Sequence, residues 1–139
     1  MAAFNKFNSF VEAVAEKVHN LGADTLKVAL SNTAPVASNT QLSNITQIGA
    51  GNGYTTGGTA TTTSVSAQTS GTYKLTITDV VFTASGGSIG PFRYIVLYND
   101  TATNDELIGW FDYGSSITLA AGETLTVDFD GTNGVLTLA

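Results

Sequence analysis

The stretch Gly90-Pro-Phe-Arg-Tyr-Ile-Val-Leu-Tyr-Asn-Asp100 decides the fold of this 139-residue chain. Between Phe92 and Tyr98 it is apolar on both faces of an extended strand, with Arg93 as the exception. A strand that is apolar on both faces belongs in the middle of a sheet that is covered on each side. We therefore predict a central strand here and expect the rest of the chain to supply its neighbours and its covering layers.

Several other segments have the period of two that is typical of a half-buried strand. The predicted strand positions are Leu26, Val28 and Leu30; Tyr73, Leu75 and Ile77; Val80, Phe82 and Ala84; Leu107 to Phe111; Leu125, Val127 and Phe129; and Val135 to Leu138. The polar, Thr-rich stretch Thr59 to Ala67 predicts an exposed or edge strand. The turn Asp130 to Gly134 predicts that the last two segments form a hairpin.

The N-terminal segment has a helical pattern instead. Its apolar residues recur at spacings of three and four, which predicts an amphipathic helix over about residues 5–21. Ser9 and Glu12 match a capping box, Asn5 offers an earlier start, and Gly22 stands where a left-handed C-cap is expected. His19, the only histidine, is expected to be a partly exposed residue of the last turn.

One helix followed by about eight short strands, with no helices between them, argues against a parallel α/β sheet. The pattern favours a mainly β fold, an antiparallel β-sandwich or jelly-roll-like domain with one N-terminal α-helix. We predict a single domain over residues 1–139, with strands from about residue 25 to residue 138.

The segment from Asn32 to Gly58 is less regular and contains several glycines. Leu42, Ile45 and Ile48 have the spacing of a helical turn or of anchors for a loop. Gly49 to Gly53 resembles a phosphate-binding loop only superficially, because no helix pattern follows it and no Walker lysine is present. We expect a pliable loop that is available for interactions.

The charge balance excludes several classes of protein. Lys and Arg number 5 against 11 Asp and Glu, which gives a net charge of −6. The basic residues are scattered, so we expect no nucleic-acid partner.

The chain has no Cys, no apolar run of membrane-spanning length and no signal-peptide pattern at its start. We therefore expect no membrane partner and synthesis in a cytoplasm.

The sequence offers few residues for chemistry. Asp112, Asp128 and Asp130 flank late strands, where a calcium site or a glycosidase pair would use such residues, but carboxylates at strand ends also cap turns. The loop from Asn99 to Glu106 is rich in oxygen ligands but lacks the spacing of a calcium loop. We expect no catalytic, cofactor or metal-ligating residue and no enzymatic activity.

One set of aromatic residues is either part of the sandwich core or a platform on which sugars stack. The set consists of Tyr94, Tyr98, Trp110, Phe111 and Tyr113.

Four stretches of this chain resemble small virion proteins of tailed bacteriophages. They are Phe4 to Gly22, Asp24 to Pro35, Gly51 to Gly58 and Gly90 to Asp100, which together run along most of the chain. The size and the acidic, Thr- and Gly-rich β character are similar to capsid decoration, or cement, proteins. The resemblance implies a structural protein that binds the major capsid protein, stabilises the shell and is located on the capsid surface after synthesis in the host bacterium. A tail or head–tail structural protein and a carbohydrate-binding module are the alternatives.

A cement protein grips a repetitive shell, and a homo-oligomer, dimer or trimer, would touch several capsid proteins at once. We expect contacts from the N-terminal residues Met1 to Phe10, from the loop between Asn32 and Gly58, and from any exposed part of the apolar stripe of the helix. The predicted contact residues are Phe4, Phe7, Phe10, Pro35, Leu42, Ile45 and Tyr54. The three phenylalanines have an alternative role, since all of them can pack against the sheet of their own chain.

Overall fold

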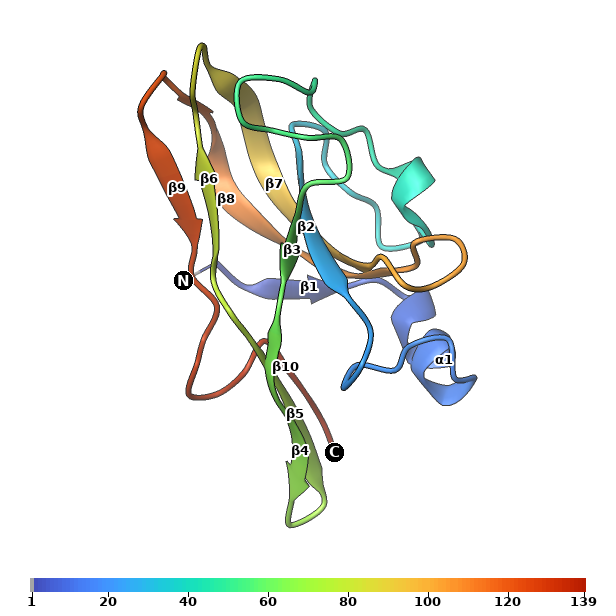
Figure 1. Cartoon of the computed structure of the whole chain (residues 1–139). Coiled ribbons are helices and arrows are strands. Elements are labelled where there is room, and N and C mark those ends of the chain that lie inside the picture. The colour runs from blue at the N-terminus through green and yellow to red at the C-terminus, as the bar shows by residue number, and fades with distance from the viewer. Residues whose placement is uncertain (1) are drawn as a thin grey trace.

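A computed structural model describes residues 2–139 and places an antiparallel sheet at the centre of the molecule (Figure 1). Its middle strand is β7 (Ile89–Asn99), flanked by β8 (Leu107–Leu119) and β2 (Leu26–Ser31). The outer strands are β1 (Phe4–Lys6) and β3 (Thr59–Thr61). The prediction of a central strand between Phe92 and Tyr98 is confirmed.

Two smaller antiparallel sheets complete the strand structure. One contains β4 (Thr63–Thr69), β5 (Thr72–Ile77) and β10 (Leu136–Leu138), in the order β10-β5-β4. The other pairs β6 (Val80–Thr83) with β9 (Thr124–Val127). Their apolar residues pack with those of one face of the central sheet into the main core. The mainly β, antiparallel sandwich-like fold with one helix is confirmed. The Thr-rich stretch predicted as one exposed or edge strand forms two strands, β3 and β4, and each lies at the edge of its own sheet.

The predicted hairpin between the last two strand segments is wrong. Leu136 in β10 pairs with Leu75 in β5, and Val127 in β9 pairs with Val80 in β6, so β9 and β10 belong to different sheets. The turn between them still forms, because the Asp130 carboxylate accepts hydrogen bonds from the backbone N–H groups of Thr132 and Asn133.

The N-terminal helix is shorter than its periodicity predicts. Helix α1 covers only Ser9–Ala15, with Asn8 as its N-cap residue, and Phe4 to Lys6 form a strand beside β8. The helix ends because Lys17 adopts a left-handed conformation (φ 67°). Val18 N–H then donates to Ala13 O at 2.8 Å and Lys17 N–H to Val14 O at 3.4 Å, a Schellman motif. The predicted span of 5–21 and the C-cap at Gly22 are both corrected. Met1, the first residue of the predicted contact segment, lies outside the described residues.

The segment from residue 32 to residue 58 is here called the cover loop (Figure 1). Leu42 and Ile45 of this loop cover the second face of the central sheet, whereas Ile48 and Tyr54 pack with the main core. The loop contains one 3-10 turn, η1 (Leu42–Asn44). A helical turn at this place is one of the two structures that the sequence predicts. Leu42 and Ile45 pack there on a second apolar cluster whose other members are Phe7, Ala29, Val96, Tyr98, Leu107 and Trp110. The central sheet is therefore covered on both faces, which explains why β7 is apolar on each side.

The described helices are all short. None of those within residues 2–139 combines the length and the apolar character needed to cross a bilayer.

Candidate partner-binding surface

The predicted contact residues fall into two groups. Phe7, Phe10, Ile45 and Tyr54 are buried inside the chain, whereas Phe4, Pro35 and Leu42 are half-buried. The four buried side chains pack within the chain instead of reaching a partner. They fill the space between the sheets, the helix and the cover loop. Phe7 and Phe10 thus anchor the fold, and only Phe4 of the three phenylalanines keeps some exposure.

The cover loop is fixed by hydrogen bonds around the Tyr54 hydroxyl. Leu30 N–H donates to Tyr54 Oη at 3.1 Å, and Tyr54 Oη donates to Gln47 Oε1 at 2.8 Å. The same Gln47 oxygen accepts from Gly57 N–H at 2.7 Å. Burial raises the pKa of the Tyr54 hydroxyl, so it keeps its proton and remains a donor. Tyr98 Oη fastens the same end of the loop by donating to Gly57 O at 2.6 Å.

Backbone hydrogen bonds hold the other end of the loop to the sheet and the helix. Leu42 N–H donates to Asp105 O at 3.0 Å, and Leu107 N–H donates to Thr40 O at 3.0 Å. Asn8 N–H, just before α1, donates to Ala37 O at 2.9 Å. The sequence predicts a pliable loop, whereas the structure fastens this segment to the sheet and to the residue before α1 by long-range hydrogen bonds, which favour a fixed arrangement.

The tight turn from Val36 to Asn39 presents an apolar side chain on this loop. Val36 N–H donates to Asn39 Oδ1 and Asn39 N–H donates to Val36 O, both at 2.8 Å. The Val36 side chain is 57% exposed, and Pro35 beside it is half-buried. An exposed apolar group on an ordered backbone is suited to binding, because little conformational entropy remains to be lost.

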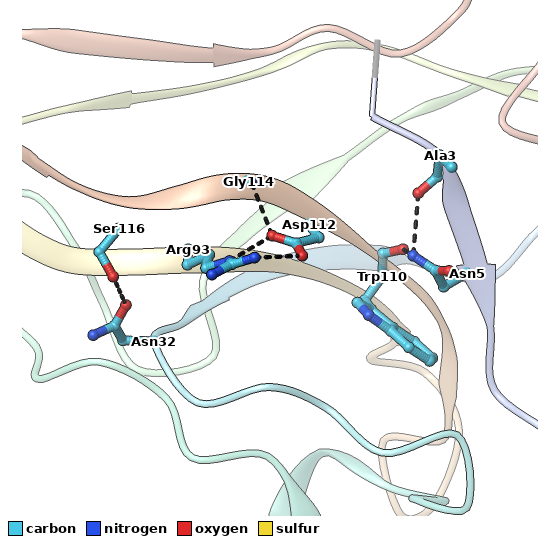
Figure 2. Close-up of polar contacts among 8 residues, drawn as sticks. All are labelled: Ala3, Asn5, Asn32, Arg93, Trp110, Asp112, Gly114 and Ser116. Carbon is cyan, nitrogen blue, oxygen red and sulfur yellow. Dashed lines mark hydrogen bonds and ion pairs between the residues drawn. The ribbon is translucent and has the colours of Figure 1, made fainter.

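Arg93 and Asp112 form a polar pair on the central sheet (Figure 2). Arg93 Nε donates to Asp112 Oδ1 at 2.7 Å and Nη2 donates to Oδ2 at 3.0 Å, while Gly114 N–H donates to Oδ1 at 2.8 Å. The hydrogen bonds from Arg93 hold the pKa of the Asp112 carboxyl below its usual value. Both oxygens are thus engaged with donors inside the chain.

The three candidate carboxylates do not converge. Asp130 is engaged with the backbone of its own turn, and these hydrogen bonds lower its pKa. Asp128 is exposed and directly follows the end of β9. Within residues 2–139 no three His, Asp or Glu side chains gather closely enough to hold a metal ion.

The aromatic residues are mostly committed to packing. Tyr98 is buried, the Trp110 ring lies 4.6 Å from that of Phe7, and Phe111 lies 5.4 Å from Phe4. By strand register, Tyr94 and Trp110 share one face of the central sheet. Tyr113 lines a groove on the opposite face with Ile95 and Phe111. The rings that keep some exposure therefore do not form one platform for a sugar.

His19 is buried, in contrast to its predicted position at an exposed helix end. Its side chain is 7% exposed, and its Nδ1 lies 3.0 Å from Asn99 Nδ2, which also donates to Asp24 Oδ2 at 2.6 Å. Two backbone N–H groups, of Thr101 and Ala102, donate to Asn99 Oδ1 and fix the orientation of the amide. Nδ1 is therefore the acceptor and Nε2 carries the proton in the neutral ring. The network ties the segment that follows α1 to Asn99 at the end of β7.

Burial of His19 predicts a specific pH dependence of stability. Desolvation lowers the pKa of the imidazole from its ordinary value of 6.5, against a smaller opposing effect of Glu106 and Asp24. As the pH falls from about 7 to about 5, His19 becomes protonated in the unfolded chain but stays largely neutral in the folded chain. The free energy of unfolding should therefore decrease. Urea unfolding at both pH values measures this change.

His19→Gln is the control, because it removes the only histidine. We expect the variant to be less stable at neutral pH but to show a much smaller loss of stability between about pH 7 and about pH 5. An equal loss in both proteins would contradict the assignment of the pH dependence to His19.

Comparisons of this chain with models of protein families, with curated proteins and with solved structures found no match.

Proposed function

We propose that this chain is a structural protein of a tailed-phage particle, which binds the shell built from the major capsid protein and stabilises it as a decoration protein. The resemblance of the sequence to small virion proteins motivates the proposal. The observation that carries it is the cover loop, which hydrogen bonds hold to the rest of the chain and which exposes Val36. No covalent step belongs to this role.

A fixed arrangement matters because binding to a shell must be strong from a small area of contact. Ordering a loop on binding costs about 0.5–1.5 kcal/mol for each immobilised side chain. The hydrogen bonds between Val36 and Asn39, and the bond from Asn8 N–H to Ala37 O, reduce that cost, since they already hold the turn in place. The net charge of −6 further disfavours competing association with the packaged nucleic acid.

The same surface would serve a tail or head–tail structural protein, because a loop held in place recognises any partner of matching shape. The two roles differ in where the protein lies in the particle and in how many copies are present. A carbohydrate-binding role is less well supported, since Tyr98, Trp110 and Phe111 pack inside the chain or along the sheet.

Val36→Asp tests the role of the cover loop in binding. The substitution puts a charge on the exposed turn without touching the core, so we expect a normal fold and binding to shells that is at least about tenfold weaker. Binding is measured by sedimentation with shells purified from particles that were assembled without this chain.

Val81→Asp is the matched control. Val81 is 52% exposed on β6, whose neighbours Val80 and Phe82 pack on the other face of the central sheet from Leu42 and Ile45, and we expect its substitution to leave binding within about twofold. Equal binding of the two variants would contradict the assignment of the surface. Failure of the unaltered protein to sediment with the shells would contradict the proposed function itself.

A further inference from the structure

The hairpin of β4 and β5 projects from the body of the molecule (Figure 1). Ser70 (φ 52°) and Gly71 (φ 85°) form its two-residue turn, and both left-handed values fit a type I′ turn. In the order β10-β5-β4, strand β4 is at the edge of its sheet. Every residue of β4 after Thr63 is exposed, including Val65 at 41%.

Strand β4 lacks the features that keep an edge strand from pairing. Its sequence, Thr63-Ser-Val-Ser-Ala-Gln-Thr69, contains no charged residue and no proline. The irregularity in its pairing with β5 lies between Thr63 and Val65, so the strand is regular from Val65 to its end. In a chain of net charge −6, a neutral edge of this kind is a surface on which a second copy meets no like charge.

The register of the hairpin identifies which backbone groups are free. Thr69 and Thr72 flank the two-residue turn and form the hydrogen-bonded pair, and such pairs alternate along an antiparallel ladder. Ala67 therefore bonds inward, to Lys74. The N–H and C=O groups of Ser66 and Gln68 point outward, toward the open edge.

We propose that two copies of this chain associate by antiparallel pairing of β4 with β4 about a twofold axis. With Ala67 on the axis, the free backbone groups of Ser66 bond with those of Gln68 of the partner subunit, and the reverse pair forms by symmetry. The two three-stranded sheets become one continuous sheet across the dimer. Each exposed Val65 then lies opposite Thr69 of the partner subunit.

Ala67 suits the axial position. The pair on the axis is a non-hydrogen-bonded one, in which Cα atoms approach to about 4.5 Å, and a small side chain permits that approach. A twofold interface is self-complementary, which requires a strand that pairs with its own sequence reversed. The uncharged side chains on both sides of Ala67 meet this requirement. This inference concerns self-association and does not depend on the partner being a capsid shell.

A disulfide test follows from the absence of cysteine in the natural sequence. Ala67→Cys places one thiol in each subunit next to the axis, where the Cα separation suits a disulfide. Thr137→Cys is the matched control, because Thr137 pairs with Lys74, which pairs with Ala67, so Thr137 lies in the same row at the opposite edge of the sheet. Under mild oxidation we expect Ala67→Cys to become mostly a covalent dimer and Thr137→Cys to remain mostly uncrosslinked. Equal crosslinking of the two variants would overturn the proposal.

Charge variants provide a second measurement, the mass in solution by light scattering. We expect the unaltered protein to reach twice its subunit mass of 14.3 kDa as its concentration rises. Ala67→Glu and Ala67→Lys should each stay at the subunit mass, because like charges then face each other, and an equal mixture of the two should regain the doubled mass. A monomer at every concentration, a trebled mass, or an Ala67→Glu protein that still dimerises would each overturn the proposal.

Discussion

We expect Phe7→Ala to lower the free energy of unfolding by about 3–5 kcal/mol, the range observed for truncation of a buried phenylalanine. Phe7 is 0% exposed and its ring lies 4.6 Å from that of Trp110. It belongs to the cluster that joins the central sheet to the cover loop, and its N–H donates to Ile108 O. The substitution therefore leaves a cavity between two layers. Urea unfolding at neutral pH measures the loss.

Val11→Ala is the control for this change. Val11 is also in the N-terminal segment, but its side chain is 55% exposed, so we expect a change within about 0.5 kcal/mol. A Phe7→Ala protein as stable as Val11→Ala would contradict the placement of Phe7 between the sheet and the cover loop. Such a result would indicate instead that Phe7 is exposed and available to a partner.

Gly58→Ala should be at least as damaging, with a loss of more than about 3 kcal/mol. Gly58 has a φ of 76°, a conformation that costs an alanine energy in addition to any clash. A Cβ at this position would overlap the carbonyl oxygen of Val28 and lie 2.9 Å from the Cα of Ala29. Both are backbone atoms of β2 and cannot move aside cheaply, so the end of the cover loop must lift from the sheet.

Gly49→Ala separates this effect from the general loss of a glycine. Gly49 is in the same loop, and a Cβ there would meet nothing within 4 Å. We expect its substitution to change the stability by no more than about 0.5 kcal/mol, measured by the same unfolding experiment. If the two alanine variants were equally stable, the close contact between the loop end and β2 would be wrong.

Much of the fold follows from local sequence patterns. The apolar run from Phe92 to Tyr98 identifies the centre of the sheet, and the polar Thr-rich stretch identifies an edge. These predictions succeed because burial on two faces, one face or neither leaves a direct signature in the period of apolar residues.

The errors come from interactions between distant residues. Phe4 pairs with Phe111 in a strand, although its spacing continues the helical pattern of α1. His19 is buried by Asn99, a residue 80 positions away. The helix ends at Lys17, which has a left-handed conformation. Lysine rarely adopts this conformation, so the sequence does not predict the helix end there.

The sequence marks the segment that carries the proposed surface, but it does not show which apolar residues of that segment are exposed. The irregular region from residue 32 to residue 58 is correctly marked as the place where the chain lacks strands. The apolar residues that stand out in it, Ile45 and Tyr54, are prominent because they pack inward. Val36 is exposed on a turn that Asn39 closes, and one isolated valine carries no information about its exposure in the sequence.

The most direct test of a structural role in a phage particle is to locate the chain in the particle by cryo-electron microscopy. Particles assembled from the genome that encodes the chain are compared with particles from which its gene has been deleted. We expect a repeated density on the capsid shell that fits this sandwich, faces the shell with the cover loop and disappears on deletion. Density confined to the tail would contradict the decoration role, and particles without the chain would contradict the structural role altogether.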